Sequence, residues 1–362
     1  MNAYDHGGNV REISRAYRID AHRLIDFSAN INPLGYPQGT KDAMIRSFDD
    51  VLHYPDTEAY DLITQLAVYH GMHRNCFIAG NGSTEFIYWL PVVLKPKRAL
   101  VVTPAFSEYE KGLRLVGSQA MCFQASEEHD FVVDMDNLYA RLAEGFDILY
   151  FCNPANPTGV LTPQENLLHL IARAERLGTI VIIDEAFIDF VEEASLKVAV
   201  AEFSNVIILR SMTKFFGIPG LRVGYVIAGS AVIERLKRDK PPWTINALAQ
   251  VCACEALSDS AFIQETRRYV ETERVFLRSA INGIPGLKAF PGVANYLSIR
   301  IDPRRDLSAT VLRERLLHEN ILIRDCSNFQ GMGNFLFRIA VRKHEENLVF
   351  IDKLREVITE CQ

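Results

Sequence analysis

The chain has 362 residues, a length that suggests two domains at roughly 150 residues each. Apolar residues make up 48% and charged residues 23%, which is ordinary globular usage and argues against a disordered, collagen-like or coiled-coil protein. The net charge of −6 comes from 39 basic and 45 acidic side chains and argues against a broad basic surface. We therefore expect no nucleic-acid and no membrane partner.

The cysteine content indicates a reducing compartment. The seven cysteines are scattered along the chain without paired CxxC spacing, as in reduced and mostly buried thiols. Charged residues run through positions 1–20, so no signal-peptide core fits there, and the apolar run at 89–94 is far short of a bilayer span. These features favour a cytoplasmic protein over a secreted or membrane protein, and we expect no metal site.

The middle of the chain alternates strands and helices. Between the second and third of its strands a helix is expected, with Thr162 as its cap, Pro163 as its first residue and Gly178 at its end. This alternation predicts a mainly parallel sheet that is covered by helices. Four nearly continuous apolar runs are the expected strands, buried on both faces, at 99–103, 147–152, 179–184 and 205–210.

The pattern of predicted elements changes beyond about residue 240. Long, charge-rich helical stretches continue to about residue 282 and predict a smaller α+β domain at the end of the chain. Its further elements are expected as strand 295–301, helix 307–319, strand 321–325, strand 335–341 and helix 344–360. We therefore divide the chain into an N-terminal arm with a short helix, a large domain and a small domain, at 1–30, 31–243 and 244–362.

Polar side chains follow three of the predicted strands. Asn156 lies in the turn NPANPTG, Asp184 ends the next run, and Lys214 follows the third. In an open α/β sheet, ligands bind beyond the carboxyl ends of the strands, so these groups should meet at one rim. Singly, each has a plainer interpretation: a rigid turn, a helix cap or a solvated lysine. Their coincidence at one edge is what predicts a functional site.

A second pattern predicts an anion site. Ser83 and Thr84 open a helix directly after the glycine-rich turn at 80–82, and free N–H groups at a helix start suit phosphate. Ser211 and Arg222, on either side of Lys214, are able to complete a phosphate cup. An amine, an anion site, a carboxylate and an amide are together what pyridoxal 5′-phosphate requires.

Several motifs in one order carry a family resemblance: YPD (54–56), GNGSTE (80–85), NPANPTG (153–159), DEAF (184–187), SMTKFFGIPGLRVGY (211–225) and the late arginines in LIRDC and FLFRIAV. With these motifs the chain resembles the fold-type-I pyridoxal-phosphate enzymes, in the branch of the histidinol-phosphate aminotransferases. The resemblance implies a large α/β domain with a mostly parallel seven-stranded sheet flanked by helices, and a smaller α+β C-terminal domain.

The resemblance also implies roles for individual residues. Lys214 would be the Schiff-base lysine, Asp184 would pair with the pyridine nitrogen and Asn156 with the ring hydroxyl. Tyr109 would stack on the cofactor ring, with Phe106 as the alternative. The cofactor phosphate would be held by Ser83, Thr84, Ser211 and Arg222, with Tyr54 reaching it from the other subunit of a homodimer.

One departure and two further motifs narrow the branch. The aminotransferases usually carry a tyrosine where this chain has Phe187, which argues against transamination. HGGN (6–9) and DFSANINPLG (26–35) resemble the threonine-phosphate decarboxylases of cobalamin side-arm synthesis, although a flexible arm and a plain loop are the simpler interpretations. This resemblance implies decarboxylation of L-threonine O-3-phosphate to (R)-1-amino-2-propanol O-2-phosphate.

The substrate phosphate is expected to bind His6, Asn30, Arg324 and Arg338, because guanidinium groups match phosphate geometry. The substrate carboxylate would then stand perpendicular to the cofactor ring. For the two arginines, an interdomain salt bridge is the structural alternative. For the whole chain, the alternatives are a histidinol-phosphate aminotransferase and a non-enzymatic regulator that retains the fold.

Overall fold

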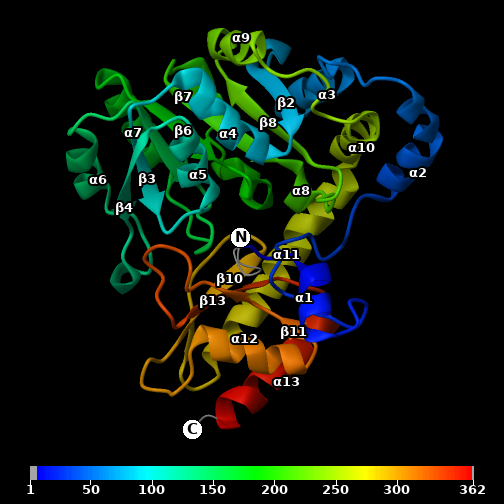
Figure 1. The fold of residues 1–362 in the computed structure, drawn as a ribbon, viewed down its shortest axis with the longest axis vertical. Coiled ribbons are helices and arrows are strands. Elements are labelled where there is room, and N and C mark those ends of the chain that lie inside the picture. The colour runs from blue at the N-terminus through cyan, green and yellow to red at the C-terminus, as the bar shows by residue number, and fades with distance from the viewer. Residues whose placement is uncertain (1–5, 361–362) are drawn as a thin grey trace.

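A seven-stranded sheet forms the centre of the large domain (Figure 1). The computed structural model describes residues 6–360. In spatial order the strands are β2 (Phe77–Asn81), β8 (Val223–Ala228), β7 (Val206–Ser211), β6 (Ile180–Asp184), β5 (Ile148–Cys152), β3 (Arg98–Thr103) and β4 (Gln119–Gln124). Of these seven strands, β8 alone runs in the opposite direction to the rest. The expected mostly parallel sheet is therefore confirmed.

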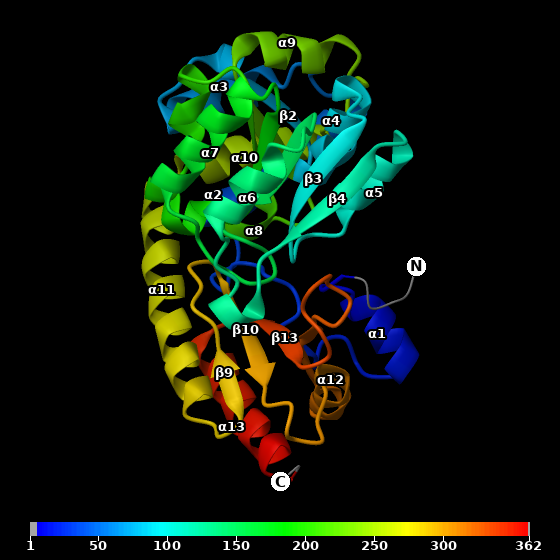
Figure 2. The same cartoon turned by 90° about the vertical axis from the view of Figure 1, so that its left-hand side faces the viewer.

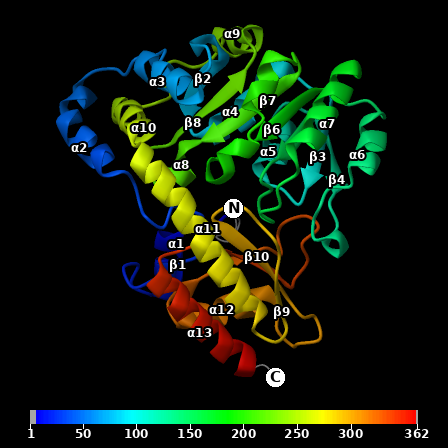
Figure 3. The same ribbon diagram turned by 180° about the vertical axis from the view of Figure 1, so that it is seen from behind.

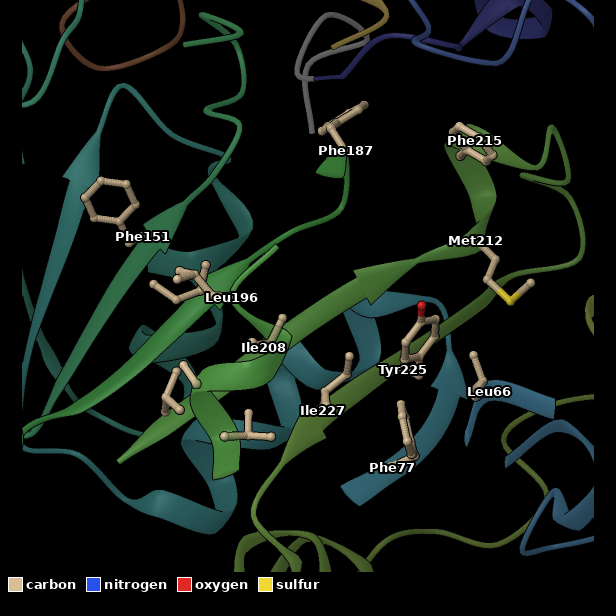
Figure 4. Packing of buried hydrophobic residues seen from close by; sticks show 14 of the residues in the cluster. Leu66, Phe77, Phe151, Phe187, Leu196, Ile208, Met212, Phe215, Tyr225 and Ile227 are labelled. Atoms are coloured by element: carbon tan, nitrogen blue, oxygen red, sulfur yellow. The ribbon is translucent and has the colours of Figure 1, made fainter. Parts of the chain in front are cut away.

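Helices cover both faces of this sheet because the strands are apolar on both sides. Successive residues of a strand point to opposite faces, so Val101 packs on one side and Leu100 on the other. One face carries α4 (Ser83–Leu94), α5 (Glu108–Leu115) and α9 (Ser230–Arg238). The other face carries α3 (Tyr60–His70), α6 (Met135–Leu142), α7 (Gln164–Arg176) and α10 (Ala247–Ser258). Figure 4 shows part of this second core, with Tyr225 beside Phe77.

The predicted start of α7 is wrong by one residue. Pro163 occupies the cap position and makes no side-chain cap, because its ring has no polar atom. The backbone of Thr162, one residue earlier, is bonded to the side-chain amide of Asn153. The predicted end is confirmed, since Gly178 has a φ of 72° and directly follows the last turn.

A four-stranded antiparallel sheet forms the small domain, with α12 (Ala309–His318) and α13 (His344–Glu360) packed in its core. The predicted single strand at 321–325 is wrong, because the chain changes sheets at Ile323. Its first half, β11 (Ile321–Leu322), pairs with β1 (Ile25–Asp26). The four strands lie in the order β12 (Arg324–Asp325), β13 (Leu336–Ala340), β10 (Tyr296–Ile301) and β9 (Leu287–Ala289).

The N-terminal segment packs on the small domain. Ile13, in α1 (Val10–Tyr17), contacts Leu317 and Leu322, and Phe27 belongs to the small-domain core. The chain then crosses to the large domain and begins α2 (Gln38–Arg46). The domain boundaries at residues 30 and 243 stay a prediction.

The chain returns to the small domain through α11 (Ser260–Asn282), a single helix of 23 residues (Figures 2 and 3). Val270 packs in the large-domain core and Leu277 in the small-domain core. The side-chain amide of Asn32, on the first crossing, donates to Thr266 Oγ1 of α11 at 2.9 Å and to the carbonyl of Phe215 at 2.6 Å. The two crossings are therefore bonded to each other.

The remaining helices are short. One turn of α-helix, α8 (Met212–Phe215), follows β7, and five 3-10 helices lie at Phe48–Leu52, Arg74–Cys76, Glu127–His129, Ile188–Ala194 and Lys197–Ala201. Within residues 6–360, no helix is both long and apolar enough to cross a membrane.

Candidate active site

A cavity of about 260 Å³ lies at the carboxyl ends of β5, β6 and β7, against the N-terminal segment and the small domain. Nearly all the residues predicted from the sequence line it: His6, Asn30, Ser83, Thr84, Tyr109, Asn156, Asp184, Ser211, Lys214, Arg222, Arg324 and Arg338, together with Phe106 and Phe187. The strand-end argument thus found the right edge of the sheet. It missed Ser28, Thr213 and Phe329, which line the same cavity. Ser28 and Thr213 lie within the motifs at 26–35 and 211–225, which could have pointed to them.

Tyr54 lies outside this cavity. Its side chain is 81% exposed, and its ring stacks on Trp243 with the ring centroids 4.7 Å apart. A role for Tyr54 in this cavity therefore requires a second subunit, and it stays a prediction.

Lys214 is placed by the short helix α8, which turns the chain immediately beyond β7. Burial, with the positive charges of Arg338 and Arg222, lowers the pKa of Lys214 to about 8, while Asp26 opposes this effect. The amine is consequently far more often neutral near pH 7 than a surface lysine, and a neutral amine is the nucleophile.

Asp184 is the last residue of β6 and is buried. Its Oδ2 accepts a hydrogen bond from the hydroxyl of Tyr109 at 2.5 Å, and its Oδ1 accepts from the backbone N–H of Ala186 at 3.0 Å. Burial raises the pKa of Asp184, and the two hydrogen bonds only partly oppose this rise. A cationic partner, such as a protonated pyridine nitrogen, would stabilise the ionised carboxylate here.

Tyr109 has a different contact from the one expected. Its ring stacks on Tyr150 inside the sheet core, with centroids 4.9 Å apart and an angle of 13°, while its hydroxyl is bonded to Asp184. Phe106 lines the cavity and meets Tyr109 edge-on. This geometry favours Phe106, the alternative left open by the sequence, as the residue that stacks on a cofactor ring.

The predicted phosphate cup lies at the start of α4. Gly82 precedes the helix with a φ of 74°, and a Cβ there would lie 2.6 Å from Nη2 of Arg222. The glycine therefore leaves the space that the guanidinium occupies. The first N–H groups of a helix lack partners within the helix, so those after Ser83 are suited to an anion. Beside them, the hydroxyls of Ser211 and Thr213 are 2.8 Å apart.

Arg338, on β13, is buried on the small-domain side of the cavity. Its Nη1 donates to Oδ1 of Asn156 and its Nη2 to the carbonyl of Ser28 at 3.0 Å. Nε of Arg338 and Oδ1 of Asn30 are buried atoms without a hydrogen-bond partner among the described residues. Unsatisfied polar atoms of this kind are costly in a folded protein, which indicates that a ligand completes them.

Arg324 lies beside Arg338 on β12. Its guanidinium packs over the ring of Phe329, 4.9 Å from the ring centroid, and Nη2 donates to Oδ1 of Asn328 at 2.8 Å. Both arginines are buried and face the same cavity. The structure therefore gathers two guanidinium groups, which bind anions well, on the small-domain side of the cavity.

Phe187 fills the position of the expected tyrosine. It contacts Tyr296 edge-on, with centroids 4.9 Å apart, while the hydroxyl of Tyr296 donates to the carbonyl of Ala155 at 2.8 Å. Tyr296 therefore does not supply the hydroxyl that Phe187 lacks. This part of the cavity wall is apolar.

The family described as Aminotransferase class I and II matches residues 22–354. The chain belongs to this family. Membership confirms the expected cofactor, pyridoxal 5′-phosphate, and the phosphate cup and the carboxylate of Asp184 fit it.

Three relatives refine this family assignment. The chain is 39% identical to the threonine-phosphate decarboxylase of Salmonella typhimurium, over 98% of this chain and 96% of that one. The L-threonine-O-3-phosphate decarboxylase of Porphyromonas gingivalis has a TM-score of 0.81 at 26% identity, covering 92% and 99% of the two chains. The histidinol-phosphate aminotransferase of Clostridium acetobutylicum has a TM-score of 0.87 at 29% identity, covering 93% and 100%. These likenesses confirm the predicted fold class.

Proposed function

We propose that this class I and II aminotransferase family member is a threonine-phosphate decarboxylase, which converts L-threonine O-3-phosphate to (R)-1-amino-2-propanol O-2-phosphate and carbon dioxide. The observation that carries the proposal is the 39% identity, over nearly the whole of both chains, to the Salmonella typhimurium enzyme. The product is the side-arm precursor of cobalamin.

The two phosphates would be held by different domains. Ser83, Thr84, Ser211 and Arg222 would hold the cofactor phosphate, and Asp184 would hold the ring nitrogen. When bound, pyridoxal 5′-phosphate supplies an electron sink for the carbanion that forms as carbon dioxide leaves. Tyr109 fixes the orientation of Asp184 and helps to keep it ionised.

The substrate phosphate would bind on the small-domain side of the cavity, to His6, Asn30, Arg324 and Arg338. The unsatisfied atoms of Asn30 and Arg338 support this placement. With both arginines on the phosphate, the substrate carboxylate can stand perpendicular to the cofactor ring, where bond cleavage is favoured. Lys214, with its lowered pKa, is suited to return a proton to Cα after carbon dioxide departs.

A single incubation separates this function from its rival. Holoenzyme with phosphothreonine should release carbon dioxide without 2-oxoglutarate. The rival, a histidinol-phosphate aminotransferase, is favoured by the TM-score of 0.87 to the Clostridium acetobutylicum structure, but Phe187 argues against it. Transfer of the amino group of histidinol phosphate to 2-oxoglutarate, with phosphothreonine left untouched, would overturn our proposal.

We also propose a homodimer, whose partner brings Tyr54 to the phosphate cup. Large apolar side chains are exposed along one stretch of the surface, at Tyr36, Ile45, Phe48, Val51, Leu52, Tyr54 and Trp243. A two-fold interface would bury such a patch on both subunits at once. The cytoplasmic location expected from the cysteine content stays a prediction.

Mixing two inactive variants tests the shared site. Tyr54→Ala and Lys214→Ala subunits, unfolded and refolded together, should recover about a quarter of the wild-type activity, because half of the subunits pair as heterodimers and each heterodimer keeps one intact site. Each variant refolded alone is the control. A fully active monomer at low concentration would contradict the dimer.

A further inference from the structure

Glu108 is a buried carboxylate at the rim of the cavity, in the first turn of α5. Its Oε1 accepts hydrogen bonds from Nζ of Lys111 at 2.7 Å and from Nε2 of His6 at 3.0 Å. Its Oε2 accepts a hydrogen bond from the hydroxyl of Tyr88, on α4. Burial acts to raise the pKa of Glu108, but the hydrogen bonds from Lys111 and Tyr88 and the charges of Lys111 and His6 outweigh it, and the pKa is lowered. The carboxylate is therefore a stable anion at neutral pH.

His6, which lines the cavity, reaches Glu108 from the N-terminal segment. A Cβ at Gly7 would lie 2.1 Å from the carbonyl oxygen of Ser28, so only glycine lets the N-terminal segment lie this close. The N–H of Gly8, at a φ of 83°, donates to Oγ of Ser28 at 2.9 Å. The same Ser28 carbonyl accepts from Arg338. The backbone of His6 is thus attached beside Arg338, on the small-domain side.

Among residues 6–360, the contacts of the His6 ring are with the large domain. It contacts Glu108 and packs against Phe106, with centroids 5.5 Å apart. Because Nε2 is bonded to Glu108, Nδ1 is the nitrogen that remains for a ligand. An imidazole that donates from both nitrogens is cationic, and a cationic donor bonds phosphate more strongly than a neutral one.

We propose that Glu108 is a positioning residue for substrate recognition, which holds the imidazole of His6 over the cavity so that His6 donates to the substrate phosphate. This inference rests on the proposed function, in which His6 is a phosphate ligand. The carboxylate itself does not contact the substrate. Its effect is on binding of the phosphate and not on the bond that breaks.

The test is a double-mutant cycle with Glu108→Gln and His6→Ala, assayed with phosphothreonine and with threonine. Glu108→Gln should raise KM for phosphothreonine about fivefold to tenfold, the effect of one weakened charge-assisted hydrogen bond, with little change in kcat. KM for threonine should not change. In the His6→Ala background, Glu108→Gln should have no further effect on KM.

Glu110→Gln is the matched control, since Glu110 is an exposed carboxylate on the same helix that contacts Cys122 and not His6. It should leave both constants unchanged. An equal rise in KM in Glu110→Gln, or an undiminished effect of Glu108→Gln without His6, would overturn the proposal. A loss of the bound cofactor's absorbance or of thermal stability in Glu108→Gln, without the selective change in KM, would also overturn it.

The two proposals fail in different ways. If the wild type does not release carbon dioxide from phosphothreonine, the proposed function falls. The same cycle with histidinol phosphate as substrate then decides the role of Glu108, because that substrate also carries a phosphate group.

Discussion

Two groups of buried charges lie at the ends of β6 and β7, and the groups differ in how their charges are neutralised. On one side, Arg210 of β7 contacts carboxylates of Glu185 at 3.1 Å, Asp189 at 2.8 Å and Glu192 at 2.5 Å. On the other side is the cavity with Lys214 and Arg338. Neither of these makes an ion pair with any of the residues 6–360. The alternation of side chains along a strand separates the two groups, because Asp184 and Glu185 point to opposite faces.

This difference indicates which charges serve the fold and which serve binding. The Arg210 cluster contains its own counter-charges, so removal of one member leaves others uncompensated. Lys214 and Arg338, which line the cavity, make no ion pair with any of the residues 6–360 and are suited to anions that arrive from outside. Four substitutions test this contrast.

The largest effect is expected from Lys214→Ala, which should abolish release of carbon dioxide while the protein remains folded. The physical reason is that no other amine lines the cavity among the described residues. Borohydride reduction of the wild type, followed by peptide mapping, should find the cofactor on Lys214. Lys197→Ala, which removes a lysine paired with Glu192 in the Arg210 cluster, is the control and should retain activity. A reduced adduct on another lysine would refute the assignment.

Arg210→Met should lower the free energy of unfolding by about 3–5 kcal/mol, because the buried carboxylates of Glu185 and Asp189 and the partly buried one of Glu192 lose their shared cation. Urea unfolding of the holoenzyme measures this loss. The same substitution at the buried Arg338 should cost clearly less, since Arg338 has no carboxylate partner there. Equal losses in the two variants would remove the distinction between the two groups.

Arg338→Ala should weaken binding of phosphothreonine far more than binding of threonine. A charge-assisted hydrogen bond is worth about 1.5–3 kcal/mol, so the preference for the phosphorylated substrate should fall by about one to two powers of ten in kcat/KM. Without this guanidinium the substrate should also rotate in the cavity. Some abortive transamination, detected as pyridoxamine phosphate, should then accompany decarboxylation. Arg300→Ala, on β10 but outside the cavity, should change neither result.

Tyr109→Phe is expected to have the smallest effect. Loss of its hydrogen bond to Asp184 removes a contribution that lowers the pKa of this carboxylate, so the pKa rises further. Asp184 then becomes neutral at a higher pH on acidification, and the acid limb of kcat/KM should move to higher pH. The free energy of cofactor binding at neutral pH should become less favourable by about 0.5–1.5 kcal/mol, which a titration with the cofactor, followed by absorbance, measures. An unchanged pH profile would argue that Tyr109 does not tune Asp184.

The sequence predicts those parts of the site that depend on local pattern. Asp184 and Lys214 follow buried strands directly, so strand periodicity and the rule for strand ends place them without knowledge of tertiary contacts. Ser83 is also predicted from local pattern, because a glycine-rich turn is followed there directly by the start of a helix.

The parts of the fold and of the site that the sequence does not predict depend on contacts with residues far away in the chain. The contact of Tyr109 with Tyr150, which favours Phe106 as the stacking residue, joins residues about 40 positions apart, and the split of the strand at Ile323 is caused by β1, almost 300 residues earlier. No sequence pattern singles out Glu108, because its partner His6 lies 102 residues away in the chain.

The position of Asn32 has a consequence for the coupling between the two domains. Its backbone N–H donates to the carbonyl of Lys214 at 3.1 Å, and its amide connects both chain crossings at one point. The small domain is bonded to the large one elsewhere as well, since Oγ of Ser298 donates to the carbonyl of Pro157 at 2.6 Å. Any shift of the small domain therefore reaches, through Asn32, the backbone that carries the reactive amine.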